Sequence, residues 1–320
     1  MLAVVIDRYG DVEELQLREL PVPEPGPNRV RIRVICASIN PVDWKLRSGH
    51  LRMYFPMKMP AQLGFDVAGI VDAVGTGVTK WADGDAVYAR LETGKAGSYA
   101  EYCLATSEFL GAKPPSMSFA DAAAVPLAAL TALQSMRDLG RLRSGGRVLI
   151  NGASGGVGTY AVQIGRAMEA HVTAVCSAPN HELVRGLGAD ACIDYRTDDF
   201  TTGDEPYDVV FDAVANKTFW RCRPVTKPGG AYVNTLISPN LAAWIAMSSI
   251  TRVFGSRTAS LIRVKPRGTD LDTLSAWIED GMLKTITDST FALADIRMAH
   301  ERSQSGRARG KVVVRVADDP

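Results

Sequence analysis

Residues 147–158 read Arg-Val-Leu-Ile-Asn-Gly-Ala-Ser-Gly-Gly-Val-Gly, and this stretch decides the fold of the chain. The apolar run Val148–Ile150 is typical of a buried parallel strand. After the glycines, apolar residues recur at helical spacing, at Val157, Ala161, Ile164 and Met168. A turn this tight needs residues without bulk, and the helix after it directs free backbone N–H groups and a positive dipole end outward. The stretch therefore predicts a site for a pyrophosphate.

The glycine spacing matches the dinucleotide fingerprint G-x-G-x-x-G in part. Ala153 stands in the place of the first glycine, whereas Gly155 and Gly158 hold the other two places. Close packing alone would also explain these glycines, but a strand before them and a helix after them are the context in which the fingerprint binds a dinucleotide. We therefore expect cofactor contacts from Ser154, Gly155, Gly156, Val157 and Gly158.

The composition is that of an ordinary globular protein. Of 320 residues, 46% are hydrophobic and 22% are charged, and the length suffices for two domains. A net charge of +1 argues against a nucleic-acid or acidic membrane surface. We find no signal-peptide pattern, and the longest apolar stretch, near 241–250, is shorter than the ~20 residues that span a bilayer. We expect a cytoplasmic protein, with no membrane span, that acts on a small molecule.

The five cysteines are scattered, with no C-x-x-C spacing, and the four histidines show no paired helical spacing. This pattern supports neither a disulfide framework nor a structural zinc site. We therefore expect reduced, buried thiols.

Residues before 118 predict a barrel-like, β-rich first domain. Short β patterns separated by turns lie at residues 1–6, 29–37, 67–74 and 85–89. Ser118 and Asp121 then have the spacing of a helix start, and Pro126 should interrupt the Ala-rich helical region that follows.

Strand and helix patterns alternate after the glycine turn, which predicts a parallel sheet with crossover helices. The expected strands lie at 171–177, 192–195, 208–214, 231–236 and 261–265, and the expected helices at 181–187, 217–222 and 271–280. Residues 310–316 again read as a strand, which we expect to return to the first domain. The fold class is therefore α/β, with a doubly wound parallel sheet in addition to the β-rich domain.

Motifs along nearly the whole chain resemble those of the medium-chain dehydrogenase/reductase superfamily, specifically its zinc-free, NADPH-dependent quinone oxidoreductase branch with the alkenal and enone reductases. The resemblance rests on residues 40–45 (Asn-Pro-Val-Asp-Trp-Lys), 63–69 (Leu-Gly-Phe-Asp-Val-Ala-Gly), 97–102, 130–134, 152–158, 187–190 and 308–311. It implies a GroES-like β-barrel catalytic domain from residues 1–118 and 267–320. It also implies a Rossmann NADP-binding domain from residues 119–266, substrate binding between the two, and a homodimer formed through the edge of the Rossmann sheet.

The same resemblance argues against zinc. Zinc-dependent relatives have a cysteine where this chain has Asn40, and a His-Glu pair where it has Phe65 and Asp66. A phenyl ring cannot ligate a metal, and a carboxamide does not replace a thiolate in a tight zinc site. We therefore predict no metal ligand, and a zinc alcohol dehydrogenase is the less favoured alternative.

The cofactor choice depends on the end of the second Rossmann strand, which reads Val-Cys-Ser at 175–177. An NAD enzyme has an Asp or Glu there, whereas the Ser177 hydroxyl can donate to a 2′-phosphate or, alternatively, cap the next helix. The resemblance implies that Tyr195, Arg309 and Lys311 lie near the same phosphate, and the planar fork of an arginine suits a phosphate. NADPH is therefore the predicted cofactor.

Three further cofactor contacts follow from the resemblance and the strand ends. Thr131 matches a threonine near the nicotinamide, and Ala213 and Leu236 come where the fourth and fifth strands end. Simple packing would explain all three equally well. Asp194 could reach a ribose, although it ends the third strand rather than the second.

Without a metal, hydride from C4 of NADPH must reach an acceptor that is already electrophilic, such as a quinone or the β-carbon of an α,β-unsaturated carbonyl. A hydrogen-bond donor would stabilise the charge that develops on the acceptor oxygen, and the resemblance places Asn40 there. Lys45 and Tyr54 are candidate proton donors, although solvent can supply the proton.

A loop rich in methionine could line an apolar acceptor pocket through Met53, Phe55, Met57 and Met59, with residues 242–254 as its other wall. The same residues could simply pack as core. A non-catalytic NADPH-binding protein stays open as an alternative, because the family needs no indispensable catalytic side chain.

Overall fold

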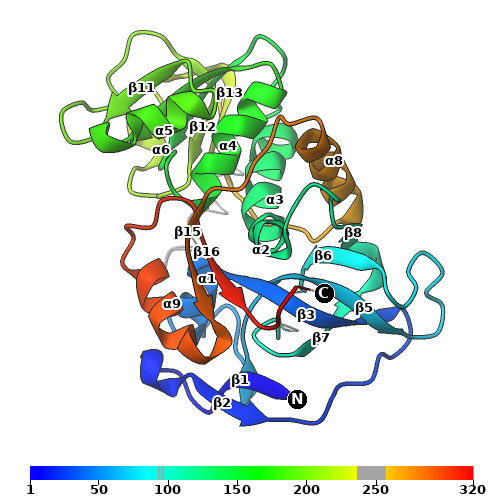
Figure 1. Cartoon of the computed structure of the whole chain (residues 1–320). Helices are drawn as coiled ribbons and strands as arrows, with labels where there is room; N and C mark the ends of the chain where they lie inside the picture. The colour runs from blue at the N-terminus through cyan, green and yellow to red at the C-terminus, as the bar shows by residue number, and fades with distance from the viewer. Residues whose placement is uncertain (93, 95–96, 236–256, 320) are drawn as a thin grey trace. The chain divides into compact units, whose positions relative to one another are not determined.

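The computed structural model describes residues 1–92, 94, 97–235 and 257–319 (Figure 1). They divide into two compact units, one of Met1–Ala128 with Lys265–Pro320 and the other of Ala129–Val264. The first unit thus contains both ends of the chain. Its boundary lies after Ala128 rather than at residue 118, because helix α2 (Phe119–Ala124) packs against strands of the first unit.

A mostly antiparallel sheet of seven strands builds the first unit, in the order β15-β16-β3-β5-β6-β8, with β7 also paired to β3. A second sheet has the order β2-β1-β4. The strands are β1 (Leu2–Ile6), β2 (Gln16–Glu19), β3 (Arg29–Ile39), β4 (Ala61–Gln62), β5 (Asp66–Val74), β6 (Ala86–Arg90), β7 (Tyr102–Thr106), β8 (Leu110–Ala112), β15 (Thr287–Ala292) and β16 (Lys311–Arg315). Because β16 pairs with β3, the predicted return of the C-terminal strand to the first domain is confirmed.

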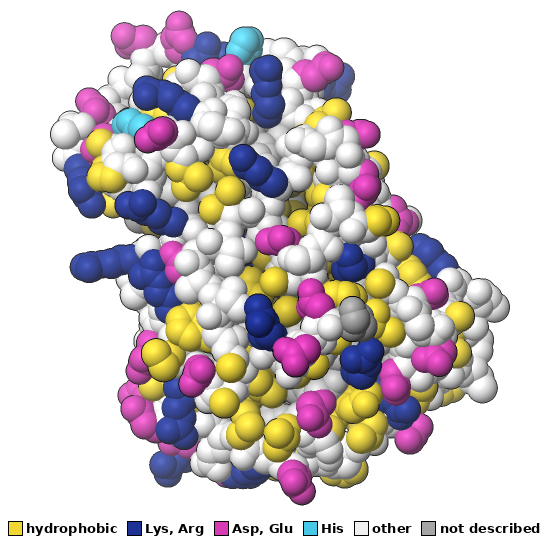
Figure 2. All heavy atoms as spheres, in the orientation of Figure 1, with side chains coloured by type: hydrophobic (Ala, Val, Ile, Leu, Met, Phe, Trp, Pro, Cys, Tyr) yellow, Lys and Arg dark blue, Asp and Glu magenta, His cyan; other side chains and the backbone are white. Residues whose placement is uncertain are grey.

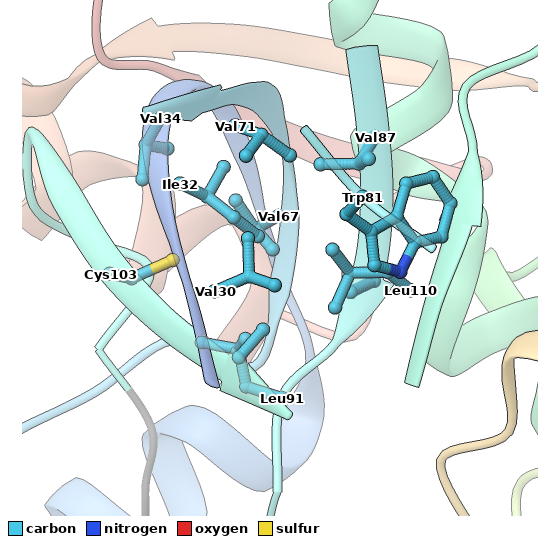
Figure 3. Close-up of a cluster of buried hydrophobic side chains, with 12 residues drawn as sticks. Val30, Ile32, Val34, Val67, Val71, Trp81, Val87, Leu91, Cys103 and Leu110 are labelled. Carbon is cyan, nitrogen blue, oxygen red and sulfur yellow. The ribbon is translucent and has the colours of Figure 1, made fainter. Parts of the chain in front are cut away.

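Apolar side chains from these strands form the core of the first unit (Figure 3). Val30, Ile32 and Val34 alternate along β3 and are fully buried, because successive side chains of a strand point to opposite faces. Trp81 closes the cluster, and its indole N–H donates to the carbonyl of Ser107 at 2.9 Å. The helices of this unit are α1 (Pro41–Arg47), α2, α8 (Gly268–Glu279) and α9 (Ile296–Gln304).

The second unit contains a parallel sheet of six strands in the order β11-β10-β9-β12-β13-β14. This order is that of the dinucleotide-binding sheet, in which the first strand lies at the centre and the chain then builds outward on each side. The strands are β9 (Arg147–Asn151), β10 (His171–Cys176), β11 (Ala191–Asp194), β12 (Tyr207–Asp212), β13 (Thr226–Asn234) and β14 (Thr258–Leu261). The predicted parallel sheet is therefore confirmed.

Helix α3 (Pro126–Gln134) begins in the first unit and continues into the second, where a π-helical turn at Ser135–Leu139 follows it. The other helices of the second unit are α4 (Gly156–Ala167), α5 (His181–Gly186) and α6 (Phe219–Cys222). Ser118 caps α2 as predicted, accepting a hydrogen bond from the N–H of Asp121 at 3.1 Å. Pro126 begins α3 after α2 has ended, so the predicted interruption is also confirmed. The last strand differs, because pairing with β13 places it at 258–261 rather than 261–265.

The described surface carries both signs of charge. Figure 2 shows Lys and Arg side chains interspersed with Asp and Glu over the visible face. Among the described residues, no helix is long and apolar enough to cross a membrane. All five cysteines are free thiols, and only Cys192 is partly exposed.

Candidate functional site

The glycine turn follows β9, the strand at which the order of the sheet changes direction. Gly152 has a φ of +85°, and Gly155 is the N-cap of α4. A Cβ on Gly158 would lie 2.0 Å from the carbonyl oxygen of Gly152, so only glycine fits there. The turn and its partly exposed residues 154–157 therefore have the form that phosphate binding at a helix N-terminus requires.

Three polar side chains meet where β9 and β10 end. The Asn180 amide donates to Ser154 Oγ at 3.2 Å and to Ser177 Oγ at 3.1 Å. Asn180 Oδ1 is buried and has no hydrogen-bond partner within the described part of the chain. Ser177 makes no side-chain capping bond, contrary to the alternative that it caps the next helix. An unused acceptor beside two hydroxyls suits a ribose hydroxyl, and the residues present thus fit the adenosine half of a dinucleotide.

Asn180 was missed by the sequence reasoning, since Ala-Pro-Asn after a strand is typical of an ordinary loop. The only available signal was its position directly after the end of the second strand, where dinucleotide-binding proteins place a ribose ligand.

Asp194 pairs with Cys176 in the parallel register, and its carboxylate therefore lies beside the end of β10. It accepts hydrogen bonds from the N–H groups of Ala178 at 3.1 Å and Arg196 at 3.0 Å. The bond from Arg196 lowers the pKa of Asp194. Tyr195 is 54% exposed, and the Arg196 guanidinium lies 5.9 Å from its ring. Asp194 thus stabilises the turns at Ala178 and at Arg196. The Arg196 guanidinium is a cation next to Tyr195 that the sequence reasoning did not single out.

Hydrogen bonds also tie together the loop after β12 and the ends of its neighbours. Asp212 accepts from the Asn151 side chain at 2.7 Å and from the Ala215 N–H at 2.7 Å. The Ala213 N–H donates to the carbonyl of Asn151, and Thr235 Oγ1 donates to the carbonyl of Ala213. Ala213 is therefore held near the glycine turn. Thr131 is buried on α3, whereas Leu236 and residues 242–254 lie outside the described residues.

In the first unit, Asn40 belongs to a buried polar network. Its Nδ2 donates to Asp66 Oδ2 at 2.8 Å, and its Oδ1 accepts from the Lys311 ammonium at 2.6 Å. Ser38 also donates to Asp66 Oδ2 at 2.8 Å, and the Leu127 N–H donates to Asp66 Oδ1 at 2.8 Å. Asp66 thereby links the end of β3 to the first turn of α3.

The surroundings of Lys311 differ from those expected of an exposed phosphate ligand. The resemblance implied that it approaches the cofactor phosphate, but the residue is 3% exposed and its ammonium lies on Asn40 and Asp66. The reason is that the first four residues of β16 are all buried, and the lysine stem extends into the unit. Burial lowers the pKa of Lys311, and Asp66 opposes this shift. Arg309 is exposed, and its N–H donates to Asp288 Oδ1 at 2.9 Å.

A second buried carboxyl lies next to this network. Asp43 is fully buried, and its Oδ2 accepts from the backbone N–H of Asn40 at 2.7 Å. Its Oδ1 has no hydrogen-bond partner among the residues that the structure describes. Burial raises the pKa of Asp43 to about 7, and the nearby Asp66 raises it further, while the Asn40 N–H opposes the shift.

The proposed proton donors are only partly buried. Burial lowers the pKa of Lys45, and its ammonium lies 5.3 Å from the ring of Trp44. Tyr54 is half-buried in the loop after α1. Met53 is 88% exposed, and its role in an apolar acceptor pocket stays a prediction, because the other predicted wall lies outside the described residues.

The residues at the metal position of zinc-dependent relatives do not fit zinc. Asn40 and Phe65 offer a carboxamide and a phenyl ring, neither of which suits a tight zinc site. Among the described residues, no group of three or more His, Cys, Asp or Glu side chains is placed to hold a metal ion.

Two family models match the chain. The alcohol dehydrogenase GroES-like domain matches residues 26–133, and the zinc-binding dehydrogenase domain matches residues 187–314. A chloroplast envelope quinone oxidoreductase homolog from Arabidopsis thaliana is 34% identical, over 98% of each chain. A trans-enoyl reductase from Aspergillus terreus is 33% identical, over 91% of this chain and 87% of its own.

A solved structure supports the same relationship. The quinone oxidoreductase from Escherichia coli, in complex with NADPH, matches with a TM-score of 0.85 and 25% identity, over 99% of this chain and 100% of its own. The expected combination of a GroES-like domain with a Rossmann-type parallel sheet is therefore confirmed.

Proposed function

The chain belongs to the medium-chain dehydrogenase/reductase superfamily, and from this premise we propose that it is a zinc-independent, NADPH-dependent reductase of quinones or α,β-unsaturated carbonyl compounds. One observation carries the proposal. The glycine turn lies at the carboxyl end of β9, where the strand order reverses and where open α/β sheets bind their ligands.

The second unit supplies the residues that would hold the cofactor. Backbone N–H groups of residues 156–158, in the first turn of α4, would bind the diphosphate, and Ser177 and Asn180 would bind the adenosine ribose. NADPH is favoured over NADH because β10 ends without a carboxylate of its own, and because Arg196 of the same unit is an exposed cation. The sequence resemblance implies the same role for Arg309, which is also exposed. The Asp194 carboxylate is the nearby group that would repel a 2′-phosphate. It already accepts hydrogen bonds from the backbone N–H groups of Ala178 and Arg196, which reduces this repulsion. The Escherichia coli relative that was solved with NADPH supports the same choice.

The acceptor class follows from the first unit. NADPH, when bound, would supply a hydride, and Asn40 and Phe65, which match zinc ligands of relatives, would not hold a Lewis-acidic zinc ion. The acceptor must therefore be polarised already, as quinones and enones are. The Arabidopsis thaliana and Aspergillus terreus relatives, named for quinone and trans-enoyl reduction, support both classes. Lys45, Tyr54 or solvent would deliver the proton that completes the reaction.

Steady-state assays test this function directly. The purified protein is mixed with NADPH or NADH and with a quinone, a medium-length 2-alkenal or a cyclic enone, and cofactor oxidation is followed by absorbance. Turnover that is faster with NADPH and persists after dialysis against a zinc chelator supports the proposal. Tight NADPH binding without turnover of any acceptor would support the non-catalytic alternative, and loss of turnover on chelation would support a zinc enzyme.

Assembly and location complete the proposal. Strands β11 and β14 end the six-stranded sheet, and exposed sheet edges need some cover, which favours a homodimer formed through this sheet. Light scattering during gel filtration would give the mass in solution. The cytoplasmic location stays a prediction, because the Arabidopsis thaliana relative is a chloroplast protein.

A further inference from the structure

A cation of the chain itself contacts two residues that, by the resemblance, match zinc-site residues of zinc-dependent relatives. Lys311 Nζ is 2.6 Å from Asn40 Oδ1 and 3.4 Å from Asp66 Oδ2, and the side chains of Lys311 and Asp66 are 3% and 0% exposed. Asn40 and Asp66 match the cysteine and the glutamate of the zinc-dependent relatives. The ammonium therefore bridges the side chains of these two residues.

The charges around this ammonium explain why a cation is needed. Asp66 and Asp43 are both fully buried carboxyl groups, and a buried ion is tolerated only beside an opposite charge and hydrogen-bond donors. The charged or titratable groups that act on Asp43 come from four segments and are Asp66, Arg90, Tyr99 and Lys311. Of these, only Lys311 and Arg90 are cations, and Lys311 contacts the network directly.

The ammonium also determines how the Asn40 carboxamide is turned. Lysine can only donate hydrogen bonds and an ionised carboxylate can only accept them. With Oδ1 on Lys311 and Nδ2 on Asp66, both contacts are satisfied. Rotating the amide by half a turn would place two donors together and two acceptors together, so the pair permits a single orientation.

We propose that the Lys311 ammonium takes the place of the metal ion as the structural cation of this position, and that Lys311 is a positioning residue for the Asn40 carboxamide. The link to turnover rests on the proposed function, in which Asn40 lies near the acceptor. The electrostatic role does not depend on turnover. A role for Lys311 at the 2′-phosphate predicts a different result. In that case, loss of the lysine would weaken the binding of NADPH and leave the binding of NADH unchanged.

The test compares Lys311→Met, which keeps the length of the side chain and removes its charge, with Lys311→Arg and with Arg309→Met at an exposed neighbouring position. Two quantities are measured, neither of which needs activity. The Asp43 carboxyl is titrated by 13C NMR, and the affinities for NADPH and NADH are measured by fluorescence titration.

Lys311→Met is expected to raise the Asp43 titration midpoint measurably, since a nearby cation favours the charged carboxylate. The ratio of NADPH to NADH affinity should not change. Lys311→Arg should keep the midpoint near that of the original protein, and Arg309→Met should leave it unaltered. An unmoved midpoint in Lys311→Met, or a selective loss of NADPH affinity, overturns the proposal.

Two safeguards keep the test decisive. If Lys311→Met does not fold, the double variant Asp66→Asn/Lys311→Met removes both charges and should recover the folded state, because removing a whole buried pair costs less than removing one partner. A double variant no better folded than the single one would contradict the charge pairing. If the original protein binds neither cofactor, the proposed function fails, while the Asp43 titration still decides the role of Lys311.

Discussion

Replacing Asp43 by asparagine should change how the stability of the first unit depends on pH. Burial raises the pKa of Asp43 from 3.8 in the unfolded chain to about 7 in the folded one. Between these values the folded chain holds a proton that the unfolded chain has released. The stabilising contribution of this proton is complete below pH 3.8 and is lost as pH rises through about 7.

The magnitude follows from the linkage relation. Each pH unit within this window costs about 1.4 kcal/mol, and the original protein should lose about 3 kcal/mol between about pH 5 and about pH 8 through this group alone. Asparagine cannot ionise, and its Oδ1 can still accept the bond from the Asn40 N–H. Asp43→Asn should therefore be more stable than the original protein near pH 8, with a smaller advantage near pH 5.

Urea unfolding at the two pH values measures the difference, with Asp83→Asn at an exposed position as the matched control. The control should follow the original protein at both values. If the gap between Asp43→Asn and the original protein is the same at both pH values, Asp43 does not hold a raised pKa, and the reasoning about this buried site is refuted.

Three further predictions concern other residues. Gly158→Ala should abolish NADPH binding in a fluorescence titration, because its Cβ would lie 2.0 Å from the Gly152 carbonyl oxygen. Gly186→Ala, which has open space around it, should bind NADPH normally. Normal binding by Gly158→Ala would refute the turn as the site. Ser177→Asp should lower the ratio of NADPH to NADH affinity by about tenfold, since a carboxylate there repels a 2′-phosphate and holds a ribose; an unchanged ratio would move the phosphate elsewhere. Arg302→Met should reduce the free energy of unfolding by about 1–3 kcal/mol at neutral pH and have little effect near pH 2. The hydrogen bond from Arg302 lowers the pKa of Asp288 to about 2, and the stabilisation is lost as pH falls through that value. An equal loss of stability at both pH values would contradict this prediction.

The sequence was informative where structure depends on neighbours in the chain. The strand β9, the glycine turn and α4 occupy consecutive residues, and both the change of period and the glycines are visible there. Ser118 and Pro126 act through local backbone geometry, and their effects on α2 and α3 could be predicted for the same reason.

The rest depended on contacts between distant parts of the chain. Lys311 meets Asp66 only because β16 pairs with β3, and nothing near Lys311 in the sequence indicates that its side chain is buried. The raised pKa of Asp43 has the same origin, since it results from burial. Asn180 was overlooked because a short polar turn carries no sign that one of its side chains will join Ser154 to Ser177.

The central claim is that the turn at residues 152–158 binds the diphosphate of NADPH, and titration of the purified protein with reduced cofactor tests it most directly. The account predicts a saturable change in fluorescence with NADPH, weaker binding of NADH, and no change with Gly158→Ala under the same conditions. No fluorescence change with NADPH, or equal responses from the original protein and Gly158→Ala, would contradict it.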